Sequence, residues 1–142
     1  MHHASIRTAN IHQAIAFYEI LGFSVCERFT TGYTLACWME GLGGRIELIQ
    51  IPQPKPAPDA FGDEHYVGYY HLSFDLTEIT PDLPGWLKNL QERVGLTAEL
   101  PPLKILLEPT QQQIGDRILE VAFIADTDGL PLEFIRFLTQ LN

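Results

Sequence analysis

The chain has 142 residues, of which 46% are hydrophobic and 11% aromatic, and this composition predicts one folded domain with an apolar core. Eighteen acidic residues against nine basic ones give a formal net charge of −9, which argues against binding to nucleic acid or to an anionic membrane. No apolar run approaches the roughly 20 residues of a membrane-spanning helix, and the first residues lack the pattern of a signal peptide. Cys26 and Cys37 lack CxxC spacing and are typical of reduced thiols. We therefore expect a cytoplasmic domain.

The first half of the sequence shows the order strand, helix and three strands. Residues 3–8 (HASIRT) alternate polar and apolar side chains as a strand does. Asn10 and Gln13 form a capping-box pattern, and apolar residues then recur at helical spacing up to Gly22. Three strands are predicted next, separated by glycine-containing turns, at residues 24–30, 33–40 and 45–51.

A proline-rich stretch separates this half from the rest of the chain. Residues 52–64 (PQPKPAPDAFGDE) contain four prolines, whose fixed φ and missing N–H groups favour an extended connector. We therefore predict a first module at residues 1–51, a linker at 52–64 and a second module at 65–142, all within one compact domain.

The second half repeats the order of the first. A strand is predicted at residues 69–76 (YYHLSFDL), followed by a helix that ends at Gly95. A second proline-rich stretch, residues 100–109, is compatible with a short strand. Two clearer strands follow at residues 117–126 and 132–138, joined by the turn signal Asp128-Gly129.

Two pairs of similar segments occur in the same order in both halves and indicate an internal duplication. The first strands read HASIRT (residues 3–8) and HLSFDL (residues 71–76). The last strands read IELIQI (residues 46–51) and LEFIRF (residues 132–137). Each half therefore carries one histidine on its first strand and one glutamate on its last.

The duplicated histidines and glutamates form a candidate metal site. Each glutamate shares a strand face with aliphatic or aromatic residues, and burial of an unpaired carboxylate costs several kcal/mol. Two imidazoles and two carboxylates meeting across a pseudo-twofold axis would suit a divalent ion of zinc, nickel, cobalt, manganese or iron, with positions left open for a substrate. The symmetry therefore predicts four ligands: His3, Glu47, His71 and Glu133.

The ordinary alternative is structural. A strand histidine is usually hydrogen bonded and half-buried, and a strand glutamate often pairs with an arginine, here Arg45 or Arg136. His2, His12 and His65 have no symmetric partner, and we interpret them as surface or loop residues.

The stretches HASIR, AFYEILGF, IELIQ, YHLSFD and DTDGLPLEF resemble the vicinal oxygen chelate superfamily, which includes glyoxalase I, extradiol dioxygenases and bleomycin resistance proteins. The resemblance implies an α+β fold in which two βαβββ modules form a cupped, open-barrel mixed sheet with a central metal site. It places metal ligands at His3, Glu47, His71 and Glu133, a pattern closest to that of glyoxalase I. Arg7 falls where that enzyme contacts the glutathione carboxylate. The segment after Glu47 and the Tyr69-Tyr70 pair depart from that enzyme and argue against glutathione.

The resemblance further implies a metal-dependent lyase or isomerase of the glyoxalase type. Its small-molecule substrate would chelate the ion through neighbouring oxygens, and a carboxylate would remove a proton next to a carbonyl to give a metal-stabilised enediolate. Glu133 is the predicted base, Glu47 a ligand or second base, and Arg7 the group that binds a substrate carboxylate. The alternatives are an extradiol Fe(II) dioxygenase using His3, His71 and Glu133, and a resistance protein that sequesters a small molecule.

We also expect a homodimer, because exposed strand edges and helix faces need cover. The metal ligands then come from one chain or from two.

Overall fold

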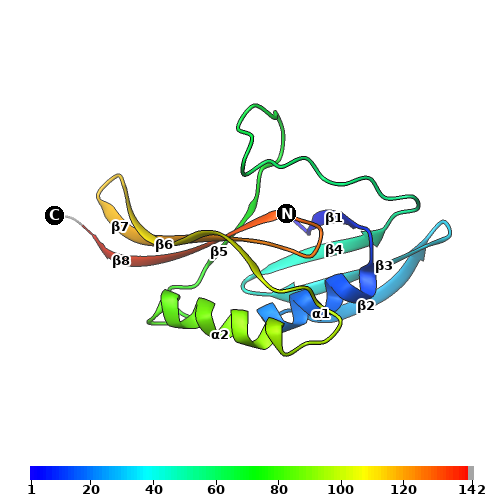
Figure 1. The fold of residues 1–142 in the computed structure, drawn as a ribbon, viewed down its shortest axis with the longest axis horizontal. Helices are drawn as coiled ribbons and strands as arrows, with labels where there is room; N and C mark the ends of the chain where they lie inside the picture. Colours follow the sequence, from blue (N-terminus) through cyan, green and yellow to red (C-terminus); the bar gives the residue numbers. More distant parts are fainter. Residues whose placement is uncertain (141–142) are drawn as a thin grey trace.

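The computed structural model describes residues 1–140, and its elements follow the predicted order twice (Figure 1). The first module contains β1 (Ala4–Thr8), α1 (Ile11–Leu21), β2 (Ser24–Thr31), β3 (Thr34–Gly41) and β4 (Gly44–Gln50). The second contains β5 (Leu72–Asp75), α2 (Leu83–Gly95), β6 (Lys104–Ile114), β7 (Arg117–Ala125) and β8 (Pro131–Gln140). The predicted βαβββ repeat and the α+β fold class are therefore confirmed.

The strands form two four-stranded sheets with matching orders, β1-β4-β3-β2 and β5-β8-β7-β6. In each sheet the first strand of the module pairs in parallel with the last, and the other pairs are antiparallel. Each module keeps its own sheet, in agreement with the expected open arrangement of two βαβββ modules. Within residues 1–140 the two sheets do not close into a barrel.

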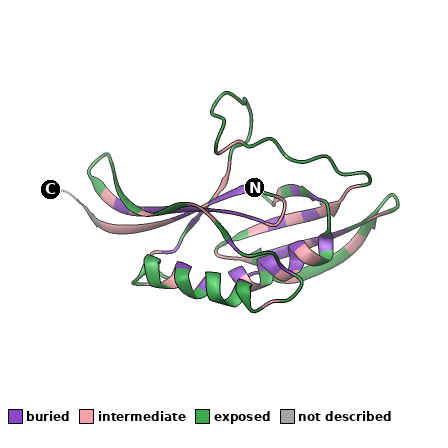
Figure 2. Ribbon diagram, in the orientation of Figure 1, coloured by how far each residue is buried: buried purple, intermediate pink, exposed green. Residues whose placement is uncertain are grey.

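Both helices lie on one side of the sheets, and Figure 1 shows them next to each other below most of the strands, where they also contact one another. One hydrophobic cluster joins them to both sheets and includes Tyr18, Met39, Leu87 and Phe134, all at most 2% exposed. Figure 2 shows that the outer side of α2 is exposed. It also shows that parts of β7 and β8 are buried where these strands cross the centre of the molecule. The two modules therefore share one core.

The turn between β7 and β8 forms hydrogen bonds that link the second module to the first. Asp126 accepts a hydrogen bond from the hydroxyl of Tyr18 at 2.7 Å, and Asp128 accepts bonds from the hydroxyl of Thr8 and the backbone N–H of Ala9. Burial raises the pKa of Tyr18 well above its usual value. Burial also raises the pKa of Asp126, although the hydrogen bond from Tyr18 and the turn N–H groups partly oppose this.

Two local predictions differ in detail from the structure. Asn10 caps α1 by accepting from the backbone N–H of Gln13 at 3.1 Å, but the side chain of Gln13 donates to the carbonyl of Glu99 and does not complete the capping box. The proline-rich stretch before residue 110 forms part of β6, an 11-residue strand. The pairing of β6 with β7 is irregular at two places, and the second, between Leu107 and Thr110, accommodates Pro109, which lacks an N–H.

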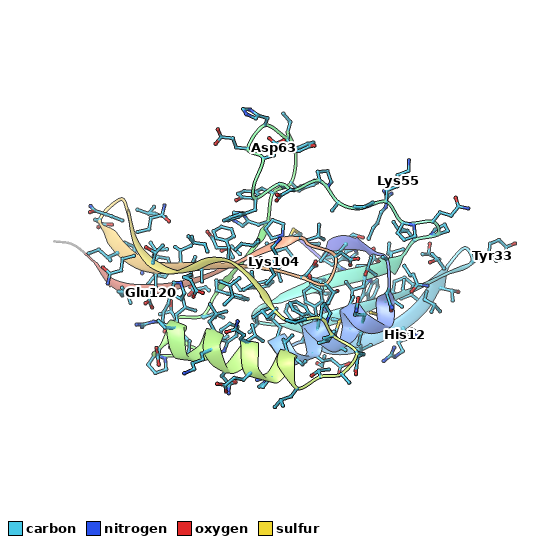
Figure 3. All side chains as sticks on the ribbon, in the orientation of Figure 1. His12, Tyr33, Lys55, Asp63, Lys104 and Glu120 are labelled. Carbon is cyan, nitrogen blue, oxygen red and sulfur yellow. The ribbon has the colours of Figure 1, made fainter. Side chains whose placement is uncertain are left out.

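The chain between β4 and β5 forms no helix or strand from residue 51 to residue 71. It arches over the side of the sheets opposite the helices, and Figure 3 shows Lys55 and Asp63 on this arch (residues 51–71), pointing away from the body of the protein. Neither helix of the described chain has the length and apolarity needed to cross a membrane.

Candidate functional site

Each sheet carries one copy of the duplicated residues at the same place, where the first strand of the module meets the last. We call His3, Ser5 and Glu47 the first half-site, and His71, Ser73 and Glu133 the second half-site. Ser5 lies opposite Glu47 in the β1–β4 pairing, and Ser73 lies opposite Glu133 in the β5–β8 pairing. Each histidine immediately precedes its strand, two residues before the serine, and therefore shares its face.

The side chains of the first half-site converge on one carboxylate oxygen. The hydroxyl of Ser5 donates to Glu47 Oε1 at 2.8 Å, and His3 Nε2 lies 3.5 Å from the same oxygen. The side chain of His3 is 26% exposed and that of Glu47 is 14% exposed. Both side chains are therefore mostly buried but still accessible to solvent.

The second half-site repeats this geometry closely. The hydroxyl of Ser73 donates to Glu133 Oε1 at 2.6 Å, and His71 Nε2 lies 3.5 Å from that oxygen. The side chains of His71 and Glu133 are 22% and 19% exposed. The duplication seen in the sequence is thus a duplication of local geometry.

The half-sites differ at the second oxygen of each glutamate. Trp38 lies opposite Glu47 on β3, and its indole N–H donates to Glu47 Oε2 at 2.9 Å. Phe123 takes the matching place opposite Glu133 on β7. A phenyl ring has no N–H, and within the described chain Glu133 accepts a hydrogen bond only from Ser73.

The histidines differ in the same direction. His2 Nδ1 and His3 Nδ1 share a hydrogen bond at 2.7 Å, and Arg45 Nη1 lies 2.6 Å from His2 Nε2. His71 Nδ1 is buried without a hydrogen-bond partner. Sequence reasoning placed His2 on the surface; it is exposed, but it also supports His3. Its position next to His3 in the chain was the only available signal.

The arginine pairs considered in the sequence do not satisfy the two glutamates. Arg45 binds Glu40, and Arg136 lies 3.6 Å from Glu120. The partners of both Glu47 and Glu133 are therefore the duplicated serines and histidines, and Glu47 has Trp38 as a further partner.

The pKa of Glu47 reflects its surroundings. Burial alone would raise this pKa, but the hydrogen bonds from Trp38 and Ser5, together with the nearby His3, outweigh burial and lower it. Glu47 is thus held as a carboxylate.

The donor set suits a divalent ion, but one chain does not assemble all four ligands. In each half-site an imidazole nitrogen and a carboxylate oxygen lie side by side on an open face, as two ligands of one ion would. Within residues 1–140, however, no three His, Cys, Asp or Glu side chains gather closely enough to hold a metal. The structure brings His3 to Glu47 and His71 to Glu133, but it does not bring the two pairs together.

Aromatic side chains surround the second half-site. The ring of Phe123 lies 4.9 Å from the ring of His71 and 5.2 Å from that of Phe61. The ring of Tyr70 lies 4.4 Å from that of His71. Phe61 and Tyr70 belong to the arch, which therefore also covers part of this site.

Arg7 is exposed on the face of β1 that carries Ser5, two residues further along. Within the described chain it makes no hydrogen bond or ion pair. It is a free cation on the strand of the first half-site.

The family model described as Glyoxalase/Bleomycin resistance protein/Dioxygenase superfamily matches residues 1–134, while no curated protein matches the sequence significantly. Among solved structures, a glyoxalase family protein from Enterococcus faecalis is similar with a TM-score of 0.69 at 19% identity, covering 96% of both chains. One from Bacillus cereus gives 0.67 at 18%, covering 98% of this chain and 94% of that one. A glyoxalase I mutant from Zea mays gives 0.69 at 18%, covering 96% of this chain and 44% of that one.

Proposed function

Because the chain belongs to the glyoxalase/bleomycin resistance protein/dioxygenase superfamily, we propose that it is a metal-dependent isomerase or lyase of the glyoxalase type. Membership by itself does not fix the reaction. The observation that supports the proposal is the repeated geometry of the two half-sites, each with a histidine nitrogen 3.5 Å from a glutamate oxygen and a serine on that same oxygen. Such open His–Glu pairs match the ligands of a divalent ion.

His3, Glu47, His71 and Glu133 would hold the ion. When bound, it would supply Lewis-acid polarisation of a substrate carbonyl that reaches it through neighbouring oxygens. The rest of the chemistry falls to side chains of this chain.

We further propose that the site is completed by a second copy of the chain. Each chain contributes the first half-site to one centre and the second half-site to another, which makes a homodimer with two sites. The support is that the half-sites lie on separate sheets and that no group of three candidate ligands forms within the described chain. The open faces of the two sheets would then cover one another.

Glu133 is the proposed base. Its Oε2 accepts no hydrogen bond within the described chain, so this carboxylate can turn toward a substrate by giving up only the bond from Ser73. It would take a proton from the carbon next to the carbonyl and return it to the neighbouring carbon, which gives a net isomerisation. Arg7 would bind a substrate carboxylate, since its guanidinium has no partner within the described chain.

The test combines the variants His3→Ala and His71→Ala. Each homodimer lacks a ligand in both sites, but a mixed dimer keeps one site with four ligands. Unfolding and refolding an equal mixture should therefore restore about a quarter of the wild-type Co2+ sites, because half of the dimers regain one of two sites. The readouts are bound Co2+ and isomerisation of the hemithioacetal of methylglyoxal and glutathione.

Three outcomes would contradict parts of this proposal. No recovery in the mixture, with full metal binding by wild type, would show that one chain holds all four ligands. A wild type that binds no Co2+ would remove the metal site. Cleavage of catechol by the iron-loaded protein would favour the dioxygenase alternative over the isomerase.

A further inference from the structure

We propose that Trp38 is a positioning residue that holds Glu47 as a fixed metal ligand and thereby leaves proton transfer to Glu133. This inference rests on the proposed metal site and goes beyond it by explaining how two equivalent carboxylates acquire different roles. The two glutamates occupy matching strands, matching registers and matching contacts with serine and histidine. Their cross-strand neighbours, Trp38 and Phe123, differ in chemistry.

The hydrogen bond from Trp38 restrains the whole carboxylate of Glu47. Ser5 binds Oε1 at 2.8 Å and Trp38 binds Oε2 at 2.9 Å, so neither oxygen can turn away without breaking a bond. A half-buried carboxylate that loses such a donor is destabilised, since its charge is then left without a hydrogen-bond partner on that oxygen. Glu47 is therefore oriented before any ion or substrate arrives.

Trp38 is itself held in place. Its ring contacts Phe29 edge-on at 5.4 Å and His2 at 4.9 Å, and it lies 5.9 Å from the ring of His3. The indole of Trp38 thus contacts His2, which is hydrogen bonded to His3, and also donates directly to Glu47. Among the described residues the second half-site has aromatic rings around His71 but no matching hydrogen bonds, since Phe123 donates nothing and His71 Nδ1 is unpartnered.

The experiment uses Trp38→Phe in the full chain, because phenylalanine is the residue that the second module carries at the matching place. The affinity for Co2+ should fall by about 10- to 100-fold, as is typical when a group that orients a metal ligand is removed. The matched control is Phe29→Leu, which changes the packing of Trp38 but keeps its N–H. It should alter the affinity by less than about 3-fold, within the usual range for a contact outside the ligand shell.

A double-mutant cycle separates positioning from general stability. In a Glu47→Ala background, Trp38→Phe should have no further effect on Co2+ affinity, because the acceptor is gone. In a Glu133→Ala background it should keep its full effect. With metal saturating, the turnover number of Trp38→Phe should stay within a few-fold of wild type, whereas a general base would cost about 10²–10⁴-fold.

Three results would overturn the inference. They are an unchanged Co2+ affinity in Trp38→Phe, an equal effect of the substitution in both alanine backgrounds, and a loss of turnover at full metal loading as large as that of a missing base. Each can occur while wild type binds Co2+ normally, which leaves the proposed function intact. A wild type that binds no Co2+ would instead overturn the proposed function and, with it, the role of Trp38.

Discussion

The first and second half-sites have the same three residues at almost the same distances, yet they differ in how firmly those residues are held. In the first, Glu47 has a donor on each oxygen, and His3 has a partner on the ring nitrogen that faces away from it. In the second, Ser73 is the only donor to Glu133 in the part of the chain that the structure describes, and there His71 has no such partner. The duplication thus gives two matching sets of side chains, and neighbouring residues bind the first set at more points than the second.

The largest expected effect comes from exchanging the two carboxylates for amides. Glu133→Gln should lower the turnover number by about 10²–10⁴-fold at full metal loading, because glutamine cannot accept the proton. Glu47→Gln should mainly weaken metal binding, by about 10- to 100-fold for a disturbed ligand. Metal titration followed by steady-state kinetics measures both. A large loss confined to Glu47→Gln would reverse the roles assigned to the half-sites.

Removal of the metal should destabilise the folded protein. A chelator leaves each half-site with a carboxylate that no cation neutralises, and the native state loses a ligand that the unfolded chain does not bind. At a free ion concentration 100 times the dissociation constant, binding contributes about 2.7 kcal/mol to the free energy of unfolding. Differential scanning calorimetry with and without chelator measures the shift in Tm. Identical curves would count against a bound metal.

Substitution of Ser5 and Ser73 tests the difference between the two half-sites with a smaller expected effect. Each serine donates to the Oε1 atom of its glutamate, but Glu47 retains Trp38 when Ser5 is lost. Ser73→Ala removes the one donor that Glu133 has among the described residues. It should therefore weaken Co2+ affinity more than Ser5→Ala, by about 10-fold against about 3-fold on the usual scale of one charge-assisted hydrogen bond. Equal losses would show that Trp38 gives Glu47 no extra support.

The smallest effect concerns the turn that joins the modules. The pKa of Asp126 is raised in the folded protein, mainly by burial, so the native state binds more protons than the unfolded chain between the ordinary carboxyl pKa and the raised one. The free energy of unfolding should therefore rise as pH falls through this window. Asp126→Asn should lack this contribution while keeping an oxygen for the turn. Urea denaturation of both proteins across acidic pH measures it, and parallel pH profiles would contradict it.

Much of the fold could be predicted because local periodicity matched the final structure. The apolar spacing between Asn10 and Gly22 predicts α1, and the repeated strand segments predict the same order of elements in both modules. Pro109 concealed the length of β6, since a proline within a strand is tolerated only at an edge or an irregularity. The contact of Phe61 with Phe123 depends on how the arch folds back, which no local pattern reports.

The sequence could predict which residues form the candidate site, but not how the two His–Glu pairs are arranged relative to each other. Duplication identified His3, Glu47, His71 and Glu133, and the structure pairs the first two and the last two. An internal repeat cannot tell whether its halves meet within a chain or between chains, because both arrangements use the same residues. The bond from Trp38 to Glu47 depends on strand register, which a sequence pattern leaves open. Metal binding and the dimer stay predictions.

The parallel pairing of the first and last strand of each module also has a consequence for the order of folding. Ser5 and Glu47 are 42 residues apart in sequence, and Ser73 and Glu133 are 60 apart. Each half-site therefore appears only when a whole module has closed on itself, and the nascent chain offers a metal ion no preformed pair of ligands. The greater separation in the second module adds only about 0.3 kcal/mol of loop-closure entropy. Lengthening β6 and β7 therefore adds little to the entropic cost of pairing β5 with β8, the step that brings His71 and Glu133 together.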